Sequence, residues 1–123
     1  MDMQSLRGGT MTDKELLELA AKAVGFVPAF NYLPKTNALI WLAKSGTPAT
    51  WRPLLDSKEA FELAVKLQME ISTFDNGSSC VSVSFKVGDR YKNFDVCVKH
   101  EQDAEAATRR AIVLVAAEIG KNL

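Results

Sequence analysis

Several features that define large classes of protein are missing or scarce in this sequence. Among 123 residues there are one histidine and two cysteines, too few for the four ligands of a closed zinc site. Fifteen Lys and Arg balance fifteen Asp and Glu, and both the first 56 residues and the remainder stay within one charge of neutral. The cationic footprint that binds a phosphate backbone is absent, so nucleic acid is not an expected partner.

Long apolar runs are also lacking. The longest, residues 111–117, is far below the roughly 20 residues that cross a bilayer, and residues 1–10 contain no apolar signal-peptide core. We therefore expect a cytoplasmic protein with no membrane partner. Residues 1–11 hold a Gly-Gly pair and end at a second methionine, so they are either a disordered leader or sequence upstream of a natural start at Met11. Residues 12–123 are predicted to form one domain.

The motifs that accompany catalysis are missing too. The chain has no G-x-S-x-G, no H-E-x-x-H, no phosphate-binding glycine loop and no dinucleotide fingerprint. We therefore predict no catalytic residue, no cofactor and no metal ion. The alternative is a small-molecule or nucleotide-binding enzyme with its site in residues 26–53, which contain all four prolines and both tryptophans.

What is present begins with helix signals. Thr12 and Glu15 have the spacing of a capping box before a helix over 13–24, and Gly25 suits its C-terminal cap. A second helix opens at Asp56 with a similar spacing. Its residues predicted to face the core are Ala60, Phe61, Leu63, Ala64, Val65 and Leu67.

Strand patterns fill much of the rest. Residues 38–43 predict one buried strand within an otherwise irregular 26–53, and the period-two pattern of 69–98 predicts three more. A last helix over 104–119 has Asp103 as its N-cap and Gly120 as its stop. The resulting order, α-β-α-β-β-β-α, predicts an α+β fold with three helices on a largely antiparallel sheet of about four strands.

The last helix is apolar on nearly every side in its second half. Such a helix is covered on more than one face, either by the rest of its own domain or by a second copy of the chain. A homodimer through residues 104–119 is therefore one of the predicted partnerships.

A two-residue turn at Gly88-Asp89 sets the register of the last two strands. It opposes Val83 to Phe94 and Cys80 to Cys97, the cysteines at a non-hydrogen-bonded site where Cα atoms come within about 4.5 Å. Reduced thiols are the expectation for a cytosolic protein and a disulfide is the alternative. For the preceding turn we predict an odd-numbered loop centred on Gly77, which opposes Ile71 to Val83.

Two places are candidate partner contacts. The sheet face opposite the apolar row is either an ordinary solvated face or a binding surface, and it carries Ser82, Ser84, Tyr91, Asn93 and Asp95. Trp51 and Arg52 combine residue types that are enriched at binding hot spots, although a Trp that closes the core is the favoured interpretation. His100 is interpreted as an exposed residue at a strand end.

Two segments resemble small tailed-phage and prophage proteins with the phage ABA sandwich domain. Residues 51–67 (WRPLLDSKEAFELAVKL) contain a Trp-x-Pro-Leu turn and a helix that ends Leu-Ala-Val-Lys-Leu, and residues 107–121 (ATRRAIVLVAAEIGK) contain Ala-Thr-Arg-Arg-Ala-Ile. The opening helix, residues 12–25, also resembles their usual start. The chain departs from the family at Arg52, where Asn is more frequent, and at Asp56-Ser57, where the family has more acidic residues.

The resemblance implies a three-layer α-β-α sandwich encoded by a phage or prophage, and it brings no catalytic residue with it. The resulting functional hypothesis is a non-enzymatic accessory protein in the bacterial cytoplasm. It would bind a host or phage protein and modulate a host process or a defence system.

Overall fold

The computed structural model describes residues 11–26, 32–42, 48–74, 77–101 and 103–123. Apart from Met11, the predicted leader lies outside them, as do parts of the 26–53 segment. Within the described residues the elements are α1 (Asp13–Ala23), β1 (Tyr32–Leu33), β2 (Ala38–Leu42), β3 (Pro48–Trp51), α2 (Ser57–Lys66), β4 (Glu70–Phe74), β5 (Ser78–Val87), β6 (Arg90–Lys99) and α3 (Ala104–Lys121). None of these helices is long and apolar enough to cross a membrane.

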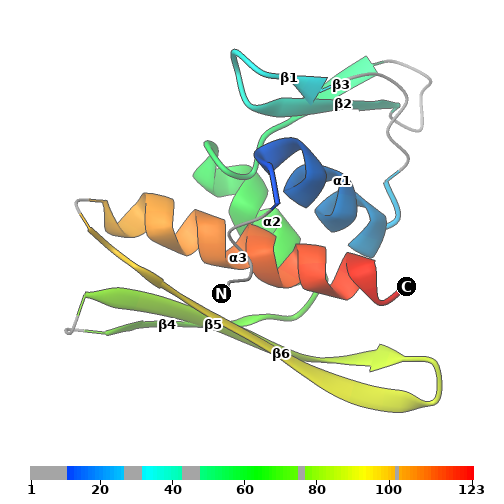
Figure 1. Ribbon diagram of the computed structural model, residues 1–123, viewed down its shortest axis with the longest axis vertical. Coiled ribbons are helices and arrows are strands. Elements are labelled where there is room, and N and C mark those ends of the chain that lie inside the picture. The colour runs from blue at the N-terminus through cyan, green and yellow to red at the C-terminus, as the bar shows by residue number, and fades with distance from the viewer. Residues whose placement is uncertain (1–10, 27–31, 43–47, 75–76, 102) are drawn as a thin grey trace.

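The strands form two antiparallel sheets, which confirms the α+β class and corrects the sheet. One sheet has the order β1-β2-β3 and the other β4-β5-β6, in place of a single sheet of about four strands. The element order is α-β-β-β-α-β-β-β-α instead of α-β-α-β-β-β-α. Figure 1 shows the helices between the two sheets, so the layers are β-α-β and not the α-β-α sandwich that the resemblance implies.

The extra strands come from the segment interpreted as mostly irregular. β2 is confirmed, but β1 has only two residues and β3 begins with Pro48. Proline has no N–H for the ladder and is tolerated at the first residue of an edge strand, which is where β3 has it. Strands this short show no period-two pattern in the sequence.

The first helix begins and ends as its sequence predicts. The Thr12 hydroxyl accepts from the Glu15 N–H at 3.2 Å, and the Thr12 N–H donates to the Glu15 carboxylate at 3.0 Å, which completes the capping box. These hydrogen bonds lower the pKa of the Glu15 carboxyl. Gly25 follows the C-cap with a φ of 79°, in the left-handed region that favours glycine.

The second helix forms only half of its capping box. The Asp56 carboxylate accepts from the N–H groups of Lys58 and Glu59, at 2.9 and 3.2 Å. The Glu59 carboxylate does not return to Asp56 and instead accepts from the Arg52 N–H at 2.8 Å. This contact fixes the turn between β3 and α2.

The core-facing stripe of α2 is narrower than predicted. The buried residues are Ala60, Leu63, Ala64 and Leu67. Phe61 and Val65 are instead 63% and 59% exposed. They lie four residues apart, one position beyond Ala60 and Ala64, and so form a second apolar stripe that no described element covers.

The β5–β6 hairpin has the predicted register throughout. Val83 opposes Phe94 and Cys80 opposes Cys97, and Gly88 supplies the left-handed turn conformation with a φ of 64°. The β4–β5 register differs from the prediction: Ile71 opposes Val81, not Val83. The number of residues between β4 and β5 is odd, as predicted, so the apolar side chains of β4 stay on the predicted face of the sheet. The centre of this connection lies one residue before Gly77, which shifts each β4–β5 pair by two residues.

The last helix lies in the middle of the molecule and is covered by its own chain. Its residues Ala111, Val113, Val115, Ala116, Ala117 and Ile119 are fully buried. They belong to one core that also includes residues of α1, α2 and both sheets. The observation that suggested a homodimer through residues 104–119 is therefore explained within a single chain.

Gly120 does not stop this helix. α3 continues to Lys121, with Asn122 as its C-cap, and Gly120 is buried against α1. A Cβ built at Gly120 would lie 2.0 Å from the Leu19 carbonyl oxygen, much closer than any real contact. Glycine is required here because two helix backbones approach each other, and not because the chain turns.

Candidate functional site: an apolar groove beside α3

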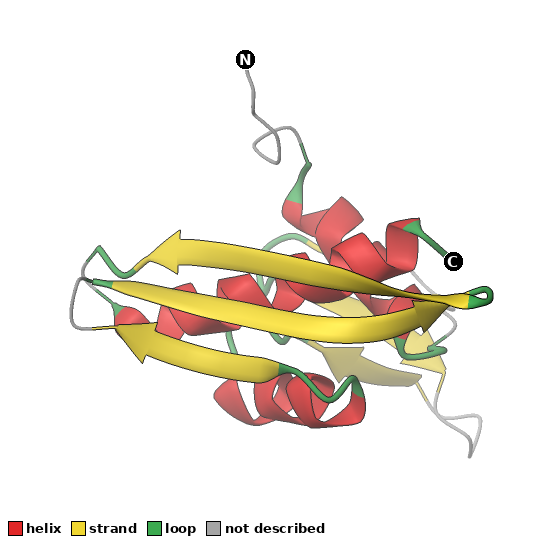
Figure 2. Cartoon of the chain, turned by 90° about the horizontal axis from the view of Figure 1, so that it is seen from below, coloured by secondary structure: helices red, strands yellow, loops and turns green. Residues whose placement is uncertain are grey.

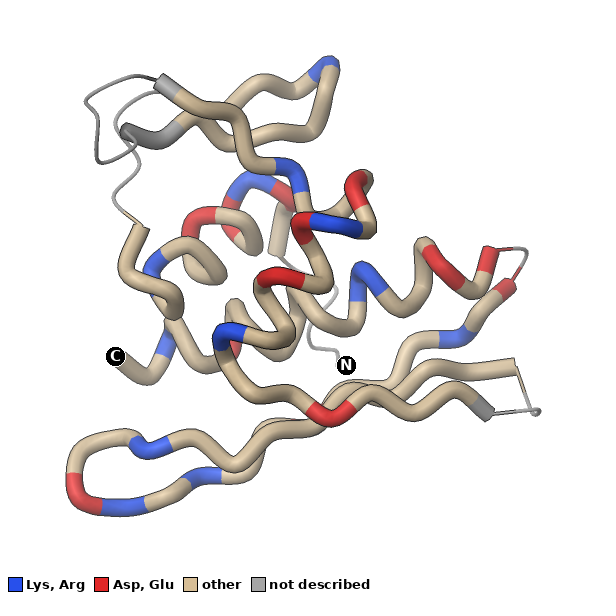
Figure 3. The backbone as a smooth tube through the Cα atoms, turned by 180° about the vertical axis from the view of Figure 1, so that it is seen from behind, with Lys and Arg blue, Asp and Glu red and all other residues tan. Residues whose placement is uncertain are grey.

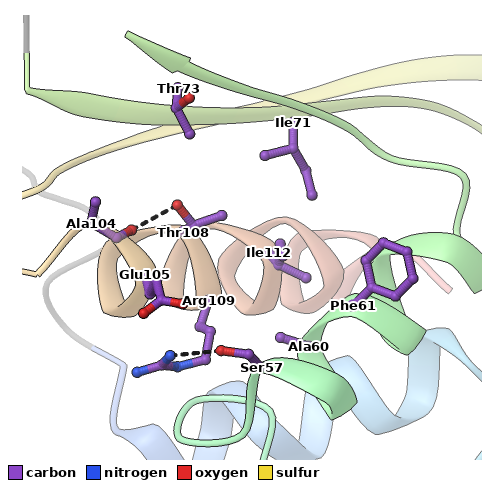
Figure 4. Close-up of a pocket in the computed structure, with 10 residues that line it drawn as sticks. All are labelled: Ser57, Ala60, Phe61, Ile71, Thr73, Ala104, Glu105, Thr108, Arg109 and Ile112. Atoms are coloured by element: carbon purple, nitrogen blue, oxygen red, sulfur yellow. Dashed lines mark hydrogen bonds between the residues drawn. The ribbon is translucent and has the colours of Figure 1, made fainter. Parts of the chain in front are cut away.

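A mostly apolar recess in the described surface lies between α2, β4 and the first half of α3. We call it the α2–β4 groove, and its volume is about 350 Å³. Figure 4 shows Ile71 and Thr73 of β4 above it, α3 below and α2 at one side. Its lining residues are Ser57, Ala60, Phe61, Ile71, Thr73, Ala104, Glu105, Thr108, Arg109 and Ile112.

Two walls of the groove carry apolar side chains that border the recess and are partly exposed to solvent. Phe61 rises from α2, and Ile71, 40% exposed, points from the inner face of β4. α2 and β4 are joined by only three residues, Leu67 to Met69, in which Gln68 has a φ of 59°. This tight connection holds the helix beside the sheet edge, and the space between them is left open.

The two charged residues of the lining have different surroundings. The Arg109 guanidinium donates to the Leu54 carbonyl oxygen at 3.0 Å and to the Ser57 hydroxyl at 2.9 Å. It therefore fastens α3 to the turn before α2. The Glu105 carboxylate makes no hydrogen bond or ion pair with the described residues, so its charge is available at one end of the groove.

A polar cluster lies under the neighbouring part of the sheet. The fully buried Ser79 hydroxyl is 2.8 Å from His100 Nε2 and 2.7 Å from the Thr108 hydroxyl. The Thr108 hydroxyl donates to the Ala104 carbonyl oxygen at 2.8 Å. His100 is thus half-buried and bonded, and the interpretation of it as an exposed strand-end residue is wrong.

The hydrogen count in this cluster argues against a serine nucleophile. When Thr108 donates its only hydroxyl proton to Ala104, Ser79 donates to Thr108 and the Nε2–H of His100 donates to Ser79. A general base would need an unprotonated nitrogen facing the serine hydroxyl. The cluster therefore joins β5, the end of β6 and α3.

The two cysteines form a disulfide, which corrects the expectation of reduced thiols. Their Cα atoms are 4.0 Å apart, close to the 4.5 Å expected for the opposed non-hydrogen-bonded pair. His100 does not join them, because it bonds Ser79 on the inner side of the sheet while Cys97 alternates to the outer side. Among the described residues no three His, Cys, Asp or Glu side chains gather as metal ligands.

The predicted polar face is assembled as the register requires. Asp95 opposes Ser82 and Asn93 opposes Ser84, and together they line a shallow hollow of about 290 Å³. Tyr91, at the hairpin end, is 71% exposed. Figure 2 shows the β4-β5-β6 sheet in front of the helices with no described element over its outer face, so this face is open to solvent.

Trp51 and Arg52 differ in burial. Trp51 is only 5% exposed, and its ring meets Phe26 edge-on at 5.3 Å, which agrees with the favoured interpretation of a residue that closes the core. Arg52 is exposed beside it. Trp51 also borders a recess of about 260 Å³ between β3 and α2. This recess is partly lined by residues of the 26–53 region, where the alternative small-molecule site was predicted. Residues 27–31 and 43–47 of that region lie outside the described residues.

Sequence interpretation missed the groove because it placed every apolar residue of α2 in the core. The four buried residues already make a complete stripe, so Phe61 and Val65 extended it beyond the width that one core face needs. That excess width was the available signal. Ile71 gave no such signal. Its inward direction was predicted correctly, and it is exposed because no described strand lies beside β4 on that side.

No protein-family model matches this chain, and no curated protein matches it in sequence.

Proposed function

We propose that this protein is a non-enzymatic protein-binding module whose binding surface is the α2–β4 groove. With the resemblance to phage ABA sandwich proteins, we further propose that it is a phage or prophage accessory protein in the bacterial cytoplasm. It would bind a host or phage protein and so modulate a host process or a defence system.

The observation that carries the proposal is the exposure of three large apolar side chains around one recess. Phe61 and Ile71 line the groove, and Val65 lies one helical turn beyond Phe61. Apolar patches rimmed by polar groups mark interaction surfaces in soluble proteins, and aromatic residues are enriched at their centres.

The two surfaces predicted from the sequence differ from the groove in their chemistry. The outer face of the β4-β5-β6 sheet carries mainly polar side chains around a hollow of about 290 Å³, which is ordinary for a solvated antiparallel sheet. Trp51, the aromatic residue proposed for a hot spot, is buried. The groove therefore offers a partner two exposed large apolar side chains, Phe61 and Ile71, whereas the Trp51 side chain is already buried.

Photo-crosslinking at two positions tests the proposal. A photoreactive phenylalanine analogue would replace Val65, which adjoins the groove, or Tyr91, which lies on the outer sheet face. In a bacterial lysate we expect the probe at position 65 to crosslink a discrete protein, and the probe at position 91 to give only background. Adding excess unlabelled wild-type chain should compete for the crosslink, and excess Phe61→Ser chain should not.

Two results would count against the proposal. Crosslinks from position 91 alone would make the outer face the binding surface. A complete lack of competed crosslinks from both positions would remove the protein-binding function.

A further inference from the structure

We infer that the occupant of the α2–β4 groove is an extended segment of the partner protein that adds a fourth strand along β4. It would have apolar side chains at alternate positions and a Lys or Arg at the end nearest Glu105. This inference rests on the proposed protein-binding function and names the form and chemistry of the partner.

The edge of β4 is open and carries little protection. Within the described residues β4 pairs only with β5, on one side. Its five residues include a single charge, Glu70, whereas β6, the opposite edge of the same sheet, carries Arg90, Lys92, Asp95 and Lys99. Charged edges discourage further strands. Because β4 carries fewer charged residues than β6, β4 is the edge of this sheet that is better suited to pair with an added strand.

The backbone groups available on this edge follow from the ladder. The His100 N–H donates to the Gly77 carbonyl, so the odd-numbered residues of β5 bond toward β6 and the even-numbered ones toward β4. Because Ser72 opposes Cys80, Ser72 bonds toward β5. The N–H and C=O groups of Ile71 and Thr73 therefore point away from the sheet, along the free edge.

The groove lies where an added strand would place its inward side chains. Ile71 and Thr73 face the helices on the inner side of β4, above α3 (Figure 4). In the view onto the sheet, α2 extends past β4 (Figure 2). A strand beside β4 would thus cover α2, and its alternate side chains would fill the cavity and contact Phe61. Backbone pairing would supply affinity and the groove would select side chains.

Charge indicates which extended segment fits. Glu105 belongs to the groove lining and makes no hydrogen bond or ion pair with the described residues. The Arg109 guanidinium keeps its charge, but its donors are directed to the neutral Leu54 carbonyl and Ser57 hydroxyl. Figure 3 shows both acidic and basic positions at the turn before α3, where Glu101 and Asp103 border a separate recess with Lys99 and Arg110, so the charge argument depends on Glu105 alone. A basic residue at this end of the partner segment would complement the field.

A second copy of this chain fits less well. An antiparallel β4-to-β4 pairing about a two-fold axis would bring the helical layers of both copies to one side of the joined sheet. Since α2 already extends past β4, both α2 helices would then compete for the space beneath the junction. A bare extended segment brings no such helix.

A displayed library of random ten-residue peptides, selected on the immobilised full chain, tests the inference. We expect enriched peptides that alternate apolar and polar residues and carry Lys or Arg near one end. Synthetic copies with single backbone N-methylations should lose binding at every second position, because only alternate N–H groups point toward β4. The loss expected at each such position is about tenfold in Kd or more.

Two variants of the chain complete the test. Thr73→Pro removes an N–H on the free edge without removing one from the β4–β5 ladder, and Thr73→Val is the matched control that retains it. We expect the Thr73→Pro chain to bind the peptide about tenfold more weakly than the Thr73→Val chain, since the two side chains are similar in size and only valine keeps the N–H. Glu105→Lys should reverse the preference for basic peptides. The N-methylation pattern stays informative even if Thr73→Pro does not fold.

The outcomes separate this inference from the proposed function. Peptides that depend on Phe61 but tolerate every N-methylation, or that show helical spacing of apolar residues, would overturn the added strand and leave the binding module intact. Self-association abolished by Thr73→Pro would make a second copy the occupant and overturn the inference. If no selected peptide depends on Phe61, both proposals fail.

Discussion

The two flanks of α3 are built in opposite ways. On one flank α1 packs so closely that Gly120 has no room for a Cβ beside the Leu19 carbonyl. On the other flank α2 packs through Ala60, Leu63 and Ala64, and a cavity of about 350 Å³ lined by Ile112 and Phe61 remains beside it. If the proposed function holds, the same helix supports stability on its α1 side, and a partner binds on the side that faces the groove. Substitutions on the closed flank should change folding, and those on the open flank should change binding.

Gly120→Ala is expected to have the largest effect. In an uncrowded helix this change would stabilise the chain by about 1 kcal/mol, because alanine favours the helix. Here the added Cβ meets backbone, which has to move, so we expect a loss of about 3 kcal/mol in unfolding free energy by urea denaturation. Lys121→Ala, at the exposed neighbouring position, is the control and should change little.

A second substitution identifies the cause of this loss. The crowded atoms belong to the Leu19 backbone, so Leu19→Ala should not rescue Gly120→Ala. Rescue, or stabilisation by Gly120→Ala alone, would show that the helices are not in backbone contact.

Removal of the Cys80–Cys97 disulfide should have the next largest effect. The bond closes a loop with a sequence separation of 17, for which chain entropy predicts about 3 kcal/mol at most. Because the β5–β6 ladder already holds the two residues opposite each other, we expect the loss of unfolding free energy to be smaller than this upper value. We expect Cys80→Ala with Cys97→Ala to lower the melting temperature and to leave groove ligands bound with unchanged Kd. A loss of binding would mean that the β4 edge depends on the bond.

Ser79→Ala should have an intermediate effect. It leaves His100 and Thr108 without their shared hydroxyl in a buried place, which costs about 1–3 kcal/mol. Ser82→Ala, on the solvated face of the same strand, should be within about 0.5 kcal/mol of wild type. Equal effects for both variants would show that the buried cluster contributes nothing beyond the strand itself.

The division between predictable and unpredictable features follows the range of the interactions. Capping at Thr12 and the hairpin register from Gly88 depend on residues within a few positions or on ladder geometry, and both are confirmed. The role of Gly120 and the exposure of Phe61 depend on which helix packs against which, at long range. A glycine near a helix end has the same sequence pattern whether it ends the helix or admits another backbone.

The candidate site was missed for a related reason. Trp51 and the polar face were selected by residue type, while the groove depends on β4 having no second neighbouring strand in the part of the chain that the structure describes. Hydrophobic pattern shows that Ile71 points inward but not whether anything lies there. Only the width of the apolar stripe on α2 pointed to a second contact surface.

Phe61→Ser, on the groove side of α2, is expected to change stability least and binding most. Phe61 is 63% exposed, so Phe61→Ser removes few buried contacts and should alter the unfolding free energy by no more than about 0.5 kcal/mol. The same substitution should abolish competition for the crosslink at position 65, because it removes the aromatic wall of the groove. Leu63→Ser, two residues further along the same helix and buried, is the converse and should destabilise strongly. If Phe61→Ser destabilised the fold as Leu63→Ser does, the open flank would be part of the core, and the argument for recognition there would be lost.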